Sequence, residues 1–201
     1  MAEPVLVLAC GALAREIQHL RQQPGWEHIR LQCLPADLHN RPELIPERIR
    51  AAIQRYRPQY PQLFVAYADC GTGGLLDRVL AEEGVERLPG AHCYATFAGQ
   101  DAFAQLAEEE PGTFYLTDFL ARHFRRLVIE SLKLDSHPQL LPLYFGNYRR
   151  LVYLAQSDSP ELLEKAQEAA NYLGLEFRVV RTGYGELALV NVAMKAMVRN
   201  G

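Results

Sequence analysis

The sequence has no excess of positive charge and no long hydrophobic run. Its 201 residues include 21 Lys and Arg against 24 Asp and Glu, which gives a formal net charge of −3. Without a basic surplus to neutralise phosphates, we expect no nucleic acid among its partners. The longest apolar runs, at 5–10 and 63–68, are far shorter than a membrane span, so we expect no membrane segment. The first residues lack the basic region of a secretory signal, and we therefore expect a cytoplasmic protein.

Cysteine is also scarce, and compact catalytic or metal-binding motifs are missing. There are four cysteines, and no two of them have the Cys-x-x-Cys spacing. In a chain that is not secreted, such cysteines are typical of thiols or metal ligands rather than disulfides. The sequence also has no Gly-x-Ser-x-Gly elbow, which leaves a serine hydrolase with little support.

Short apolar, β-rich runs alternate with helical stretches along the whole sequence. We expect strands at 5–9, 29–34, 63–68, 85–88, 113–116, 151–154 and 176–180. We expect helices between them and a last helix near 185–199. This alternation predicts an α/β fold, a Rossmann-like layered fold with a mostly parallel sheet flanked by helices. Because no Gly-, Ser- or Pro-rich linker divides the sequence, we expect a single α/β domain over 1–201 or two α/β halves, about 1–110 and 111–201.

Three of the four cysteines follow predicted strands. Cys10 comes directly after the first strand, Cys70 follows the third, and Cys93 lies in the loop after the fourth. Because the carboxyl ends of parallel strands meet at one edge of a sheet, we expect these thiols to face the same crevice. We also expect helix amino termini there to lower the thiol pKa values and to favour the thiolate. Cys33 differs, because it lies inside the second strand, and we interpret it as a core residue.

Three thiolates could hold a [4Fe-4S] cluster with one iron open to substrate, or a zinc ion with a fourth ligand or water. The predicted metal ligands are therefore Cys10, Cys70 and Cys93. Their spacing fits no compact zinc motif, so it does not decide between the two metals. His39 and His92 are candidates for the fourth zinc ligand. The candidate catalytic residues are His92, His39 and Asp118, although Asp118 is also placed to be a plain helix cap.

The segment 69–74, Asp-Cys-Gly-Thr-Gly-Gly, is the densest local signal. Glycines after a strand let backbone N–H groups point at an anion, and the following helix adds its dipole. Arginine pairs well with carboxylates and phosphates, and one lies after the second strand. The predicted contacts to an anionic cofactor or substrate are Gly71, Thr72, Gly73, Gly74 and Arg41. The alternative interpretation is a tight turn with close helix packing.

Several motifs that include these residues occur together: 9–13 (Ala-Cys-Gly-Ala-Leu), 38–42 (Leu-His-Asn-Arg-Pro), 67–74, 90–94 (Gly-Ala-His-Cys-Tyr), 116–120, 144–148 and 152–156. With these motifs the chain resembles, over nearly its whole length, the bacterial and archaeal domain of unknown function 1638 family. The family name implies no activity. The resemblance implies a link to corrinoid-dependent methyl transfer, with a corrinoid protein or a methyltransferase as partner. The arrangement is also loosely similar to that of quinolinate synthase, in which three α/β units each supply one cysteine to an open [4Fe-4S] cluster.

These features predict a metal-binding protein whose three-cysteine site, an iron-sulfur cluster or zinc, lies at the carboxyl edge of the sheet. If it is an enzyme, we expect a metal-dependent lyase or transferase that acts on a small anionic or thiol-containing substrate. One alternative is a non-catalytic carrier of metal or cofactor for a methyltransferase system. Another is a metal-free enzyme with Cys70 as the nucleophile.

Overall fold

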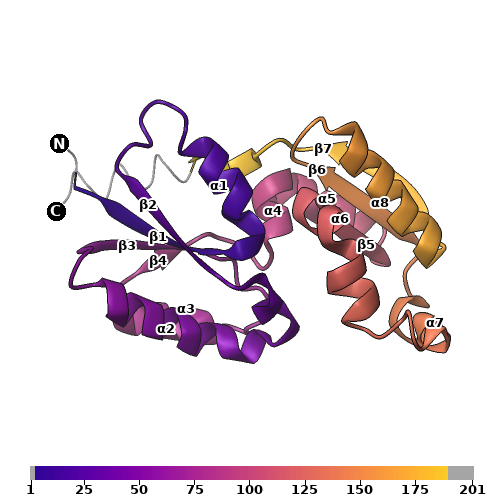
Figure 1. Cartoon of the computed structure of the whole chain (residues 1–201), viewed down its shortest axis with the longest axis horizontal. Helices are drawn as coiled ribbons and strands as arrows, with labels where there is room; N and C mark the ends of the chain where they lie inside the picture. Colours follow the sequence, from indigo (N-terminus) through magenta and orange to yellow (C-terminus); the bar gives the residue numbers. More distant parts are fainter. Residues whose placement is uncertain (1–2, 190–201) are drawn as a thin grey trace. The chain divides into compact units, whose positions relative to one another are not determined.

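The computed structural model describes residues 3–189, which form two compact units (Figure 1). Within this range, unit 1 comprises residues 3–96 and 186–189, and unit 2 comprises residues 97–185. Each unit is built on its own sheet, and all strand pairs in both sheets are parallel. The predicted α/β class is confirmed, with the strands divided between two sheets. Among the described residues, no helix has the length and apolar character needed to cross a membrane.

Unit 1 has a four-stranded sheet in the order β2-β1-β3-β4. Its strands are β1 (Val5–Cys10), β2 (Ile29–Leu34), β3 (Gln62–Ala66) and β4 (Glu86–Arg87). Every residue of β1 is buried, as expected of a central strand covered on both faces. The strand order reverses at β1, because β2 pairs with one side of it and β3 with the other. In open α/β sheets, ligands bind outside the carboxyl ends of the strands at such a switch point.

Helices cover both faces of this sheet. They are α1 (Ala14–Leu20), α2 (Ile45–Tyr56) and α3 (Leu75–Glu83). Unit 1 also contains the short 3-10 helices η1 (Gly11–Leu13), η2 (Ala36–Asn40) and η3 (Pro42–Leu44), whereas α4 (Cys93–Ala98) and the 3-10 helix η6 (Gly185–Leu189) cross the boundaries between the two units. Figure 1 shows α2 and α3 side by side on one face and α1 on the other. In α2, Ile45, Ile49 and Ile53 recur at four-residue spacing and are fully buried. Pro42 begins the 3-10 helix η3, which directly precedes α2.

Unit 2 has a three-stranded sheet in the order β5-β6-β7. Its elements are β5 (Thr113–Thr117), β6 (Arg150–Ala155), β7 (Glu176–Arg181), α5 (Gln100–Glu109), α6 (Asp118–Phe124), the π-helical η4 (Arg125–Glu130), the 3-10 helix η5 (Pro138–Leu140), α7 (Leu141–Phe145) and α8 (Pro160–Leu173). The side chain of Ser159 caps α8 by accepting from the Leu162 N–H at 3.3 Å, and Gly174 ends it in a left-handed conformation.

The structure contains a strand at each of the seven predicted positions, with bounds shifted by a few residues at most. The helical stretch that follows β5 consists of α6 and then the π-helical segment η4. Of the last helix, expected near 185–199, residues 185–189 form the 3-10 helix η6, and the remainder lies outside the described residues.

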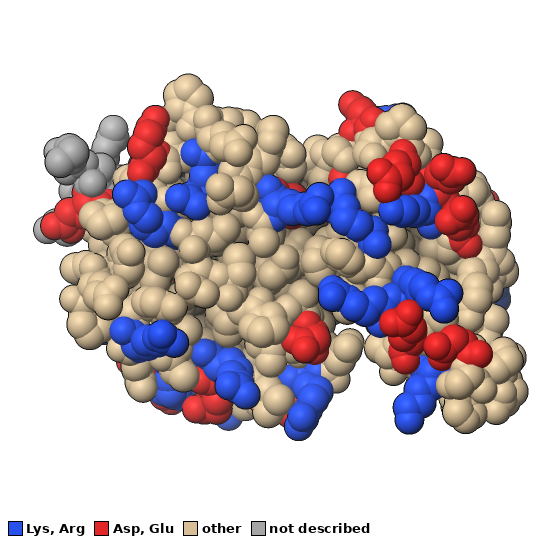
Figure 2. All heavy atoms as spheres, in the orientation of Figure 1, with Lys and Arg blue, Asp and Glu red and all other residues tan. Residues whose placement is uncertain are grey.

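Charges of both signs are mixed on the surface. Figure 2 shows acidic and basic side chains next to one another over much of unit 2. Arg178 pairs with Glu109 at 2.8 Å, and Lys165 pairs with Glu161 at 2.6 Å. Exposed pairs of this kind each contribute about 0–1 kcal/mol. The exclusion of nucleic acid as a partner stays a prediction.

Candidate metal centre

Three thiols lie together at the carboxyl edge of the sheet of unit 1. Cys10 ends β1, Cys70 follows β3, and Cys93 is the first residue of α4, where a loop was expected. The three side chains are close enough that the charge of Cys70 raises the pKa of Cys10, and the charges of both raise that of Cys93. The turns after β1 and β3 flank the point at which the strand order reverses. The structure therefore brings the three cysteines together, whereas their role as metal ligands stays a prediction.

Burial raises the pKa values of these thiols, so the expectation that helix termini lower them is wrong. The pKa of Cys10 is raised to about 12 and that of Cys70 to about 11, and the pKa of Cys93 is raised well above its usual value. Loss of water is the largest cause in each case. A hydrogen bond from the Ala12 N–H to the Cys10 sulfur, at 3.3 Å, offsets only part of it. The helical segment after Cys10 opens with the 3-10 turn η1, which continues into α1 at Ala14.

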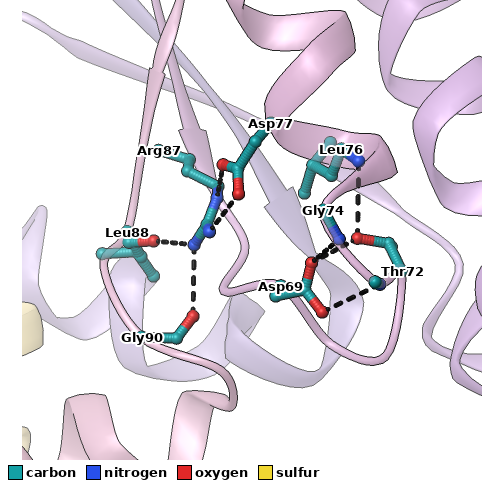
Figure 3. A network of polar contacts seen from close by, with 9 residues as sticks. Asp69, Thr72, Gly74, Leu76, Asp77, Arg87, Leu88 and Gly90 are labelled. Atoms are coloured by element: carbon teal, nitrogen blue, oxygen red, sulfur yellow. Dashed lines mark hydrogen bonds and ion pairs between the residues drawn. The ribbon is translucent and has the colours of Figure 1, made fainter.

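The predicted anion cradle after β3 binds the chain's own carboxylate. Thr72 Oγ1 donates to Asp69 at 2.6 Å, and the N–H groups of Gly73 and Gly74 donate to it at 3.1 and 2.9 Å (Figure 3). Desolvation acts to raise the pKa of Asp69, but these three bonds outweigh it and lower the pKa. An external anion would compete with Asp69 for the donors, which favours the tight-turn interpretation. Anion binding by Gly71, Thr72, Gly73 and Gly74 stays a prediction.

The turn places Cys70 in a left-handed conformation, with φ at 52°. This conformation costs a residue with a side chain about 1–2 kcal/mol. It persists only where the surrounding structure imposes it, and such positions cluster at functional sites. Here the N–H of Cys70 donates to the carbonyl of Ala91 at 2.8 Å, and the N–H of Asp69 donates to that of Gly90 at 3.1 Å. These bonds tie the Cys70 turn to the loop that leads to Cys93.

Arg87, at the end of β4, fixes that loop. Its guanidinium binds both carboxylate oxygens of Asp77 on α3, at 2.6 and 3.0 Å. It also donates to the carbonyls of Leu88 at 2.6 Å and Gly90 at 3.2 Å (Figure 3). The Gly90 carbonyl is the one that accepts from Asp69, so Arg87 helps to hold the Cys70 turn in register. Arg87 was not predicted from the sequence, because a basic residue at the end of a short strand gives no local signal.

His39 lies against Cys10 on the other side of the cluster. Its Nδ1 is 3.6 Å from the Cys10 sulfur and 3.2 Å from the carbonyl oxygen of Ala36. Its ring stacks on that of Tyr67, with centroids 6.1 Å apart and an interplanar angle of 12°. Loss of water lowers the pKa of His39, and the nearby His92 lowers it further. At neutral pH, His39 is therefore an uncharged imidazole beside a protonated thiol.

Glu16 is a buried carboxylate that the sequence analysis also missed. It lies on α1, is 5% exposed, and its charge helps to raise the pKa of Cys93. A signal was present in the sequence, because Glu16 falls on the same helical face as the buried Leu13, Ile17 and Leu20. An acidic residue on an apolar face is an exception that indicates a special environment.

Three further residues of unit 1 are not part of this cluster, although Cys33 is near enough that its charge helps to raise the pKa of Cys10. Cys33 is half-buried and lines a surface groove between β2 and α2, so its interpretation as a core residue is wrong. The reason is that β2 is an edge strand of the sheet. Arg41 is exposed and pairs with Glu43 at 3.4 Å, and anion binding by it stays a prediction. His92 is exposed in the loop before α4, near enough to influence His39.

Asp118 belongs to unit 2, where it is buried. Its Oδ1 accepts from the Tyr153 hydroxyl at 2.7 Å and from the Gln156 N–H at 3.0 Å, and its Oδ2 accepts from the Ser157 hydroxyl. The cap of α6 is Thr117, so the interpretation of Asp118 as a plain cap is wrong. Asp118 instead joins α6 to the end of β6. A catalytic role for it stays a prediction.

Comparison with known proteins assigns a family. A family model described as "Protein of unknown function (DUF1638)" matches residues 33–190. The matched range includes His39, Cys70 and Cys93, whereas Cys10 precedes it. Neither a curated protein nor a solved structure matches the chain. Because the family match spans well over half of the sequence, the chain belongs to the DUF1638 family.

Proposed function

We propose that this is a metal-binding protein in which Cys10, Cys70 and Cys93 ligate one metal centre at the carboxyl edge of the unit 1 sheet. The observation that carries the proposal is the grouping of three desolvated thiols from three separate turns at the switch point of the sheet. Close, desolvated thiols oppose one another's ionisation. A bound cation favours the thiolate form of all three and so offsets that cost.

The donor set suits a thiophilic metal. Thiolates with an imidazole are typical zinc ligands, and three thiolates are typical of a [4Fe-4S] cluster with one open iron. Within residues 3–189, no three His, Cys, Asp or Glu side chains are already arranged to hold a metal ion. Binding therefore requires the thiols to close on the ion. The Cys70 turn and the loop before Cys93 are already joined by backbone hydrogen bonds, so their backbone can stay in place.

The distance between Cys10 and His39 favours zinc, with His39 as the fourth ligand. A sulfur at about 2.3 Å and a nitrogen at about 2.0 Å from a tetrahedral zinc ion lie about 3.5 Å apart. The observed Sγ–Nδ1 distance is 3.6 Å. The lowered pKa of His39 keeps its ring uncharged, as a ligand must be, and Nδ1 would give up its contact with the Ala36 carbonyl. His92 makes no such contact with a sulfur among the described residues.

Four protein ligands fill a tetrahedral zinc ion, so the metal supplies Lewis-acid chemistry, or holds a substrate thiol or carboxylate, when the substrate takes the place of His39. We propose a lyase or a transferase on this basis, with a small anionic or thiol-containing substrate. A link to a corrinoid protein or methyltransferase rests on the family resemblance alone. A carrier of metal or cofactor would use the same thiols without turnover, and a turnover assay with the loaded protein separates the two.

The metal-free alternative, with Cys70 as a nucleophile, has less support. A reactive cysteine needs a substantial thiolate fraction near neutral pH. With the pKa of Cys70 raised to about 11, only about one molecule in ten thousand is ionised at pH 7. No feature of the described residues lowers this pKa enough to compensate, because desolvation exceeds the hydrogen bonds to the sulfur.

The test is the metal content of protein purified without oxygen. We would measure zinc, iron and acid-labile sulfide per chain in the wild type and in Cys10→Ser, Cys70→Ser and Cys93→Ser. Cys33→Ser is the matched control, because Cys33 is the fourth cysteine of the chain and lies in a surface groove. We expect about one zinc per chain, lost in the three site variants and retained in the control. About four iron and four sulfide with the same pattern would assign the cluster instead. No metal in the wild type, or loss only in Cys33→Ser, would contradict the proposal.

A further inference from the structure

Tyr67 is a buried hydroxyl group beside the thiol cluster. It follows β3 directly, and its side chain is fully buried. No described residue completes a hydrogen bond with its hydroxyl oxygen. Leaving a buried polar group without a partner costs about 1–3 kcal/mol, so a Tyr in this position requires an explanation.

The hydroxyl faces Cys10. Apart from burial, the strongest influences on the pKa of Tyr67 are the charge of Cys10 and the contact between the hydroxyl and the Cys10 side chain, and both raise this pKa. A phenol carries its proton at neutral pH and is therefore a hydrogen-bond donor. A protonated thiol is a weak acceptor, whereas a thiolate accepts strongly. His39 stacks on the Tyr67 ring and so restrains the direction of the hydroxyl.

We propose that Tyr67 is a positioning residue of the metal site, whose hydroxyl donates a hydrogen bond to the Cys10 sulfur when that sulfur is a metal-bound thiolate. The inference rests on the proposed function and adds a partner that is not itself a ligand. In the metal-free protein the Cys10 thiol is only a weak acceptor for this hydroxyl, and metal binding converts it into a thiolate that accepts strongly. Hydrogen bonds from neighbouring groups to metal ligands commonly change metal affinity about 10- to 100-fold.

A purely structural role for Tyr67 makes a different prediction. If the ring only fills space, Phe would serve as well, and removing the orphaned hydroxyl would stabilise the protein without changing metal binding. If the hydroxyl serves the thiolate, Tyr67→Phe stabilises the metal-free protein but weakens the metal-bound one. Measuring stability and metal affinity in the same variant therefore separates the two roles.

The experiment uses the full chain, stripped of metal and titrated with Zn²⁺ or Co²⁺ against a competing chelator. We compare the wild type with Tyr67→Phe, and use Tyr115→Phe as the control because Tyr115 lies in unit 2. We expect the dissociation constant for Zn²⁺ to rise about 10- to 100-fold in Tyr67→Phe and to stay unchanged in the control. The thiolate-to-cobalt charge-transfer band should move to longer wavelength, because a sulfur without the hydrogen bond is richer in electrons.

An unchanged dissociation constant and an unchanged band in Tyr67→Phe would overturn the inference while leaving the metal site intact. A wild-type chain that binds neither ion, or binds them equally well after Cys10→Ser, would overturn both the proposed function and the inference. Tyr67→Met is a second variant without a donor, in case Tyr67→Phe does not fold. It should weaken binding in the same way.

Discussion

The raised thiol pKa values predict how many protons leave the protein when zinc binds. At pH 9.0 three ordinary thiols, with a pKa of 9.0, would be half ionised and would release about 1.5 protons on binding a metal. With pKa values of about 12 for Cys10 and about 11 for Cys70, and a value well above 9.0 for Cys93, the folded protein keeps all three protonated at this pH. It should release about 3 protons per zinc. His39 adds none, because its lowered pKa leaves it uncharged.

Isothermal titration calorimetry of the metal-free protein measures this number directly. The titration is run at pH 9.0 in two buffers that differ in ionisation enthalpy, and the difference in heat gives the protons released per metal. Cys33→Ser should give about the same value as the wild type, since Cys33 is not a proposed ligand and lines the groove between β2 and α2. A value near 1.5 would refute the argument from burial. A value below one would show that the thiols are not the ligands.

Three further predictions concern stability. The pKa of Cys10 in the folded protein, about 12, lies above its unfolded value of 9.0. The contribution of Cys10 to the free energy of unfolding is therefore complete below pH 9 and is lost as the pH rises toward 12. In urea unfolding of the metal-free protein, the free energy of unfolding should fall by about 2 kcal/mol more in the wild type than in Cys10→Ala between pH 8 and pH 10.5. Parallel pH profiles of the two proteins would contradict this. Asp69→Ala removes three hydrogen bonds from the Cys70 turn and should lower the free energy of unfolding by about 2–4 kcal/mol, whereas the exposed Asp37→Ala should change it little. Equal effects of the two substitutions would count against the role of Asp69. Tyr153→Phe removes the hydroxyl that donates to the buried Asp118 and should lower the free energy of unfolding by about 1.5–3 kcal/mol. The metal content should be unchanged, and loss of metal in this variant would be inconsistent with a site built in unit 1.

The strands were predictable from the sequence because they are short apolar runs between turn residues. The clearest are β1 and β6, in which every residue is buried. Their division between two sheets was not predictable in the same way, since pairing joins segments distant in sequence. β1 pairs with β3 across more than fifty residues, for example, and no local pattern records that choice.

The position of the thiols followed from the same local pattern, because a residue after a parallel strand must lie at the carboxyl edge. The ionisation of the thiols could not be predicted from this pattern, since it depends on how much water the folded chain excludes around Cys10 and Cys70. The glycine turn was identified as a donor-rich segment, but the carboxylate that takes up its N–H groups, Asp69, was not identified as their partner. Tyr67 was missed because an aromatic residue after an apolar strand resembles ordinary core.

X-ray absorption at the metal edge of protein purified without oxygen tests most directly whether three thiols hold one metal. We predict three sulfur neighbours at about 2.3 Å and one nitrogen at about 2.0 Å for zinc. The number of sulfur neighbours should fall in Cys10→Ser, Cys70→Ser and Cys93→Ser and stay the same in Cys33→Ser. A first shell of nitrogen and oxygen alone, or a sulfur number that none of the three site substitutions changes, would contradict the assignment.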